Sequence, residues 1–114
     1  MKKYFLSLLF SFIVFSQDYD FKGHHLIASY YDCDFDALID LKTLESVMID
    51  ATIKTNATVL DSSTYEFENN GFSMVILLSE SHASIHTYPE YRSCFIDIFT
   101  CGDSCEIVNF HKRL

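Results

Sequence analysis

The sequence is poor in basic residues. Eight Lys and Arg stand against sixteen Asp and Glu, so the formal net charge is -8. Nucleic acids and anionic membrane surfaces are themselves negative, and a chain of this charge is not expected to bind either of them. An acidic protein is better suited to a cationic ligand.

The sequence also lacks a continuous apolar run of the length that a membrane-spanning helix needs, about 20 residues. A shorter apolar run, Tyr4–Phe15, follows two lysines and precedes a Ser16–Gln17 bond of the kind that signal peptidases cut. Residues 1–20 therefore form a leader, which is a signal peptide, a hydrophobic extension that packs or anchors, or the product of an early start codon. We leave it out of the fold and expect a cytoplasmic protein, bound to a membrane only if the leader is retained as an anchor.

No CxxC pair occurs among the four cysteines, and no HExxH motif occurs among the histidines. In the cytosol the cysteines would be thiols, most of them buried and inert, whereas export would allow Cys101 to pair with Cys105 or Cys94. His82 and His86 form an HxxxH pair, but a spacing of four residues does not bring side chains together in a strand and turn region. We therefore expect no bound metal.

The chain contains neither an internal repeat nor a low-complexity linker, so residues 21–114 are expected to form a single domain. The core of so small a domain would be thin. Yet 49% of the residues are hydrophobic, with eleven Phe and seven Tyr among them. This excess of apolar surface favours association with a second copy of the chain.

The hydrophobic pattern predicts strands and helices in alternation. Gly23–Tyr31 is expected to be a strand, and apolar residues at three- and four-residue steps predict one helix from Phe35 to Thr55. Further strands are expected at Ala57–Leu60 and Thr64–Phe67 (one strand or two pieces), Phe72–Leu78 and Cys94–Phe99, with a turn at Asn69–Gly71 and a last helix that carries Ile107, Val108 and Phe110 and is capped by Asp103 or Ser104. This order predicts an α+β protein, a two-layer α/β sandwich in which an antiparallel sheet has helices on one face.

The stretch Ser79–Tyr91 lies between the two most apolar strand candidates and is rich in Ser, His and carboxylates. Polar groups gathered at the ends of buried strands often form a site, because the strands fix their positions. Composition alone favours a Ser-rich connecting loop.

Four motifs run in order through this stretch and the strand after it: Glu80-Ser81-His82, Ile85-His86-Thr87, Pro89-Glu90-Tyr91 and Phe99-Thr100-Cys101-Gly102. They resemble the signature of the prokaryotic type of S-adenosylmethionine decarboxylase, and the similarity extends from about Gly23 to Asp103. Proenzymes of this family cut themselves and turn a serine into a pyruvoyl group. The resemblance implies the same two-layer fold, a homodimer of processed protomers and a part in polyamine (spermidine) biosynthesis.

The resemblance also implies a role for each matching residue. The cut falls between Glu80 and Ser81, and Ser81 becomes the pyruvoyl cofactor that forms a Schiff base with S-adenosylmethionine. Decarboxylation needs such an electron sink because side chains lack one. His86 and Ser73 assist processing, and Cys101 donates the proton to the decarboxylated carbon. Substrate binding falls to two aromatic residues beside the adenine and a carboxylate at the ribose hydroxyls: Phe67, Tyr88 and Glu90.

Two departures from the family pattern leave alternatives open. Tyr88 stands where Trp is more frequent, which admits arginine or ornithine as the amino acid that is decarboxylated. The chain is also short at its C-terminus and carries the added leader, as a non-catalytic homologue with a binding or regulatory function would. A secreted, disulfide-linked binding domain is a third alternative, and it leaves the motifs unexplained. Taken singly, Ser73 and Ser81 also fit ordinary strand serines, and Phe67 and Tyr88 fit core aromatics.

Overall fold

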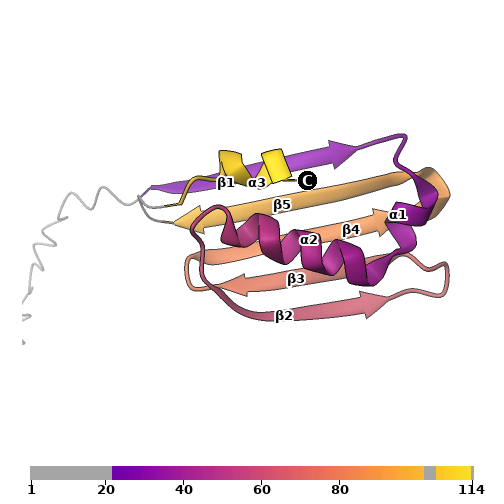
Figure 1. Ribbon diagram of the computed structural model, residues 1–114, viewed down its shortest axis with the longest axis horizontal. Coiled ribbons are helices and arrows are strands. Elements are labelled where there is room, and N and C mark those ends of the chain that lie inside the picture. Colours follow the sequence, from indigo (N-terminus) through magenta and orange to yellow (C-terminus); the bar gives the residue numbers. More distant parts are fainter. Residues whose placement is uncertain (1–21, 102–104, 114) are drawn as a thin grey trace, which may run out of the picture.

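A computed structural model of the protein describes residues 22–101 and 105–113. Its elements follow in the order β1 (Gly23–Tyr30), α1 (Phe35–Ile39), α2 (Leu41–Ile53), β2 (Val59–Glu66), β3 (Phe72–Leu78), β4 (Ser81–Tyr88), a 3-10 turn (Pro89–Tyr91), β5 (Ser93–Cys101) and α3 (Val108–Arg113). The strands pair in the order β1-β5-β4-β3-β2, and every pairing is antiparallel. The helices lie on one side of this sheet (Figure 1). The predicted two-layer α/β sandwich is thereby confirmed.

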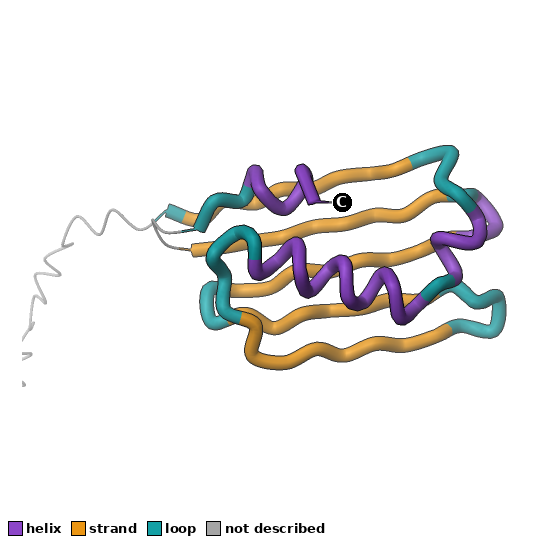
Figure 2. The backbone as a smooth tube through the Cα atoms, in the orientation of Figure 1, coloured by secondary structure: helices purple, strands orange, loops and turns teal. Residues whose placement is uncertain are grey.

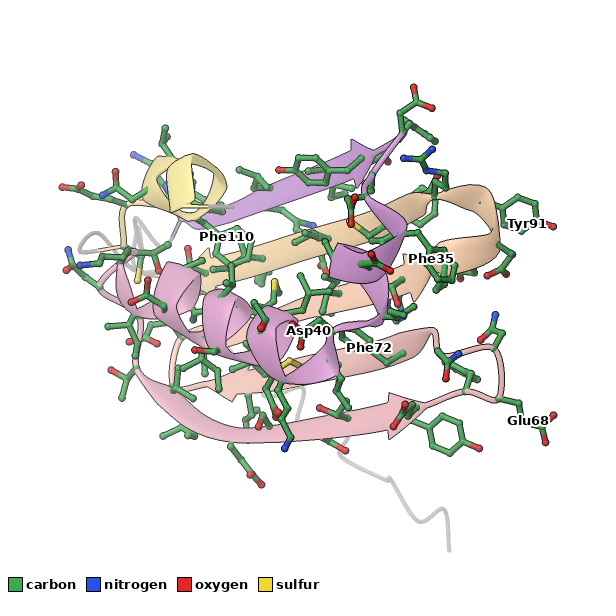
Figure 3. The ribbon with its side chains drawn as sticks, turned by 45° about the vertical axis from the view of Figure 1, so that its right-hand side comes forward. Phe35, Asp40, Glu68, Phe72, Tyr91 and Phe110 are labelled. Atoms are coloured by element: carbon green, nitrogen blue, oxygen red, sulfur yellow. The ribbon has the colours of Figure 1, made fainter. Side chains whose placement is uncertain are left out.

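The core lies between the sheet and the helices. Residues of β3 alternate between the two faces, so that Phe72, Met74 and Ile76 are fully buried while Val75 and Leu77 are about half exposed. Phe110 of α3 is also fully buried, and Figure 3 shows it on the same side of the sheet as Phe72. The helices cover this face because it collects the apolar half of each strand.

The long helix expected over Phe35–Thr55 is two helices, separated at Asp40 (Figure 2). Asp34 caps the first helix by accepting from the Ala37 N–H at 3.0 Å, and Asp40 caps the second by accepting from the Thr43 N–H at 3.1 Å. Aspartate at an N-cap satisfies a backbone donor that has no partner within the helix. A second N-cap inside the apolar periodicity therefore divides one amphipathic pattern between two helices.

The polar stretch Ser79–Tyr91 is mostly strand rather than loop. Its residues 81–88 form β4, which is paired on both sides, to β3 and to β5. Alternate residues explain this: Ala83, Ile85 and Thr87 are buried, whereas His86 and Tyr88 are partly exposed. That period of two was present in the sequence, hidden by its Ser and His content.

The second face of the sheet, opposite the helices, has no covering layer in the part of the chain that the structure describes. We call it the open face. It mixes polar side chains with exposed apolar ones, among them Ile27 (73% exposed), Tyr65, Val75, Leu77 and Phe95. The 22–101 and 105–113 segments contain no helix that is both long and apolar enough to cross a membrane. The leader at residues 1–20 and the expected helix caps Asp103 and Ser104 lie outside the described residues.

Candidate active site

The hairpin that joins β3 to β4 contains the expected cleavage bond and is held in place from two sides. At the start of β2, the Thr58 carbonyl accepts from the Ser79 N–H at 3.0 Å, and the Thr58 N–H donates to Glu80 Oε2 at 2.9 Å. At the end of β5, the Cys101 N–H donates to the Glu80 carbonyl at 3.2 Å. Burial raises the pKa of the Glu80 carboxyl, but hydrogen bonds from Thr58 and Ser79 outweigh it and leave the pKa below its usual range. The Glu80 carbonyl is thus fixed beside an N–H donor.

Ser81 begins a chain of hydrogen-bonded side chains that runs across three strands. Its Oγ lies 3.1 Å from His82 Nδ1, and His82 Nε2 lies 3.3 Å from Asp97 Oδ2 on β5. The same Oδ2 is 2.8 Å from His25 Nε2 on β1, and Ser84 Oγ donates to Asp97 Oδ1. Burial raises the pKa of Asp97, but the hydrogen bonds from Ser84 and His25 and the neighbouring His82 prevail and lower it. Asp97 is therefore an ionised acceptor at neutral pH.

Sequence reasoning missed the convergence of His25, His82 and Asp97, because only the pairing of β1, β4 and β5 brings the three side chains together. Their ligand atoms lie within 4.8 Å of one another, so the trio is also of a kind that can hold a metal ion. The 2.8 Å separation of His25 and Asp97 is that of an N–H···O hydrogen bond. The HxxxH pair does not converge: four residues along a strand span roughly 13 Å, and His86 is bonded elsewhere.

Cys101 ends β5 at the same end of the sheet as Ser81, since Ser81 pairs with Thr100. Cys101, Cys33 and Cys94 are thiols rather than disulfides. Burial, with Cys33 beside it, raises the pKa of the Cys94 thiol to about 12, so this cysteine is inert. Cys101 is half-buried and lies at the same end of the sheet as the cleavage hairpin.

Ser73 and His86 face each other across β3 and β4 and form a direct pair. Ser73 Oγ and His86 Nδ1 are 2.7 Å apart, and both side chains are partly buried. The two residues expected to assist processing are therefore in contact with one another. They lie on the open face, five residues along β4 from Ser81, which corresponds to roughly 17 Å.

Next to this pair is a cavity of about 670 Å³ at the end of the sheet where the β2–β3 and β4–β5 turns meet. Glu68 and Tyr91 extend from those two turns (Figure 3). The cavity walls combine aromatic rings with three carboxylates, and its lining consists of Tyr65, Glu66, Phe67, Glu68, Asn69, Ser73, Thr87, Tyr88 and Glu90. The Tyr65 and Phe67 rings are 4.9 Å apart, and Asn69 Nδ2 donates to Glu90 Oε2 at 3.0 Å. Such walls suit a planar ligand that carries positive charge.

The residues predicted from sequence thus fall into two groups on one protomer. Ser81, Glu80 and Cys101 lie at one end of the sheet, while the remaining five lie at the other end: Ser73, His86, Phe67, Tyr88 and Glu90. The second group also includes four residues that flank Phe67 in the sequence and were not predicted: Tyr65, Glu66, Glu68 and Asn69. The end of β2 and the turn that follows it bring them to the cavity.

Known proteins resemble this chain both in sequence and in fold. The family model described as S-adenosylmethionine decarboxylase matches residues 24–114. Proteins named S-adenosylmethionine decarboxylase proenzyme are 44% identical in Thermosipho africanus and 42% identical in Bacillus cytotoxicus, each over 84 residues that make up 74% of this chain and 65% of the relative. The one from Fervidobacterium nodosum is 46% identical over 81 residues, 71% of this chain and 59% of the relative.

A solved structure gives the same result for the fold. The adenosylmethionine decarboxylase of Aquifex aeolicus superposes with a TM-score of 0.73 at 32% identity, covering 80% of this chain and 75% of that one. The chain spans about 65% of the length of the first curated relatives. Their names give no support to arginine or ornithine as the substrate. With its family model, relatives and fold in agreement, the chain belongs to the S-adenosylmethionine decarboxylase family.

Proposed function

We propose that this protein is a self-processing, pyruvoyl-dependent decarboxylase of S-adenosylmethionine, which supplies the aminopropyl donor for spermidine biosynthesis. The observation that carries the proposal is the hairpin at Glu80–Ser81. His82 Nδ1 lies 3.1 Å from Ser81 Oγ. The Glu80 carbonyl, which this hydroxyl would attack, accepts a hydrogen bond from the Cys101 N–H. The relatives' names, which combine decarboxylase with proenzyme, support both halves of the proposal.

The surroundings of Ser81 fit the formation of a pyruvoyl group. Attack of Ser81 Oγ on the Glu80 carbonyl converts the peptide bond into an ester, and loss of that ester leaves dehydroalanine, which hydrolyses to pyruvoyl and ammonia. Ser81 is the first residue of β4, so after the cut its main chain stays paired with β5. When present, the pyruvoyl carbonyl supplies the electron sink that decarboxylation needs. We assign the return of a proton to the substrate carbon to Cys101, at the same end of β5, because a thiol can donate a proton.

The cavity fits the nucleoside and the charge of S-adenosylmethionine. Phe67 and Tyr88 offer ring faces to the adenine and to the positive sulfonium, and Glu90 offers a carboxylate to the ribose hydroxyls. Glu66 and Glu68 add negative charge to the same walls. A cationic substrate is thereby favoured over an anionic one.

The two groups of site residues support a homodimer that packs open face against open face. Within one protomer the cavity and the Ser73–His86 pair are too far from Ser81 to act on it. A two-fold axis through the open face would bring the Ser81 end of one protomer against the Ser73–His86 end of its partner. The exposed apolar side chains of that face, Ile27 and Leu77 among them, would be covered by the same contact.

The test is intact mass under denaturing, reducing conditions, followed by carbon dioxide release from carboxyl-labelled S-adenosylmethionine. We expect two fragments that meet at the Glu80–Ser81 bond, the second with a pyruvoyl end, and turnover of the labelled substrate. Ser81→Ala should remain one chain, whereas Ser46→Ala, which changes an exposed serine of α2 away from the hairpin, should still be cut. Cys101→Ala should be cut but lose turnover by about 100-fold or more, the usual contribution of an acid that donates a proton in the reaction.

Three outcomes would contradict the proposal. A wild-type chain that stays uncut, in folded form, would indicate a non-catalytic homologue. A Ser81→Ala chain that splits at the same bond would exclude the pyruvoyl mechanism. Release of carbon dioxide from labelled arginine or ornithine, with none from S-adenosylmethionine, would leave self-processing intact and change the substrate.

A further inference from the structure

We propose that His82 is the general base that takes the Ser81 hydroxyl proton at the start of self-cleavage, and that Asp97 and His25 hold it in position. The inference rests on the proposed function, because it names the group that starts the cleavage. It gives a task to three side chains that none of the expected processing or binding roles uses.

The first support is the contact between the base and the nucleophile. A serine hydroxyl is a weak nucleophile until a neighbouring group takes its proton, and hydrogen-bond distance is the geometric requirement for that group. His82 Nδ1 meets it at 3.1 Å from Ser81 Oγ. His86, the other histidine of β4, is turned to Ser73 and lies roughly 17 Å along the strand.

The second support is the orientation of the imidazole. An ionised carboxylate only accepts, so Asp97 Oδ2 fixes the proton of His82 on Nε2 and leaves the Nδ1 lone pair directed at Ser81. Asp97 is itself held by the 2.8 Å bond from His25 and by the Ser84 hydroxyl. Nucleophile, base and orienting carboxylate thus follow one another as they do in serine hydrolases, here on two neighbouring strands of one sheet.

In the described part of the chain, two titratable side chains lie beside His82. The titratable groups that face it are Asp97 of β5 and His25 of β1. From β3 the residue in register is Leu77, which carries no charge.

The proposed step is balanced in atoms and protons. The Ser81 hydroxyl proton moves to His82 Nδ1 while a bond forms between Oγ and the Glu80 carbonyl carbon. The Cys101 N–H, 3.2 Å from that carbonyl oxygen, stabilises the negative charge that develops on it. The bond from this carbon to the Ser81 nitrogen then breaks, and His82 gives its proton to the departing nitrogen. The product is the ester, and the base is regenerated.

The experiment follows cleavage of the full chain over time after cell-free synthesis, by gel and intact mass. His82→Gln should slow cleavage by about 100-fold or more, the usual contribution of a general base. Asp97→Asn, which keeps the shape of the side chain but loses its charge, should slow it by about tenfold or more. The matched control is His24→Gln. His24 precedes His25 in the sequence and is exposed, but it is in register with the buried Thr100 and therefore does not lie on the open face. Its rate should equal the wild-type rate.

Hydroxylamine separates this step from the next one, since it cuts esters much faster than amides. His86 is expected to act in that next step, the loss of the ester, by taking the Ser81 Cα proton. In His86→Ala the ester should therefore accumulate, and hydroxylamine should split the chain after residue 80. In His82→Gln the ester should form too slowly to accumulate, so hydroxylamine should leave the uncut chain whole. A role of His82 confined to folding would not produce this contrast, and circular dichroism of both variants shows whether each is folded.

The other possible results distinguish a failure of the proposed function from a failure of the role proposed for His82. An uncut wild-type chain would remove the proposed function itself. Wild-type cleavage with a His82→Gln rate within about threefold of it would overturn only the present inference, as would a folded Asp97→Asn chain that is cut at the wild-type rate. Loss of wild-type cleavage in EDTA would also overturn it, because the trio would then act by holding a metal ion. Should His82→Gln fail to fold, the Asp97→Asn rate decides the question.

Discussion

Ile76 and Leu77 are neighbours on β3 that lie on opposite faces of the sheet, and truncating each of them to Ala should have different consequences. Ile76 is fully buried, and Leu77 is 52% exposed. Each substitution removes three carbons, worth about 0.8 kcal/mol apiece when fully buried. Ile76→Ala should lower the free energy of unfolding by about 2.4 kcal/mol, because these carbons are no longer transferred from water to the core. The cavity left behind adds to the loss, which should fall within about 2–5 kcal/mol. Leu77→Ala, already half exposed and leaving no closed cavity, should lose about 1 kcal/mol in an isolated protomer.

The proposed dimer changes the stability loss expected for Leu77→Ala but not the loss expected for Ile76→Ala. If a partner covers the open face, Leu77→Ala should lose up to about 2.4 kcal/mol per protomer when the protein is concentrated, because the leucine is then fully buried. Urea denaturation followed by circular dichroism, at several protein concentrations and in the uncut Ser81→Ala background, measures both losses. If Ile76→Ala does not fold, Ile76→Val replaces it, with an expected loss of about 0.5–1.5 kcal/mol in the free energy of unfolding.

Two results would refute this reasoning. Equal losses for the two variants at the lowest concentration would contradict the assignment of the faces. A Leu77→Ala loss that does not grow with protein concentration would contradict a dimer formed through the open face.

Three further predictions follow from the site. Glu90→Gln should raise KM for S-adenosylmethionine by about 10–100-fold with little change in kcat, since a charge-assisted hydrogen bond contributes about 1.5–3 kcal/mol, whereas Glu68→Gln in the same cavity should change KM much less. Because the pKa of Asp97 is lowered in the folded protein, its contribution to stability is present above the ordinary carboxyl pKa of about 4 and is lost as the pH falls below it. The difference in stability between wild type and Asp97→Asn should therefore shrink on acidification. A difference that stays constant with pH would contradict this prediction. The Cys94 thiol, with its pKa raised to about 12, should resist iodoacetamide at pH 8 in the native protein and react after denaturation, as peptide mass mapping would show.

Most of the fold was predictable because it depends on local patterns. The apolar strand Phe72–Leu78 was expected with the bounds that the structure has, since a continuous apolar run between turn residues identifies a buried strand. The break at Asp40 was not expected, because an N-cap inside a helical periodicity is visible only once the backbone leaves the helix there. Strand β4 was treated as a site between strands, because serine and histidine obscured its alternation.

The amino-acid sequence by itself determined the family motifs, the order of the strands and helices, and the residue types available for chemistry around Ser81. Only the tertiary structure decided which of them meet. The antiparallel register places Ser73 opposite His86, and it brings His25, His82 and Asp97 together from three strands. It also separates the Ser81 end of the sheet from the cavity. Register is set by pairing between distant segments and by burial of one face, and spacing along the chain does not contain that information.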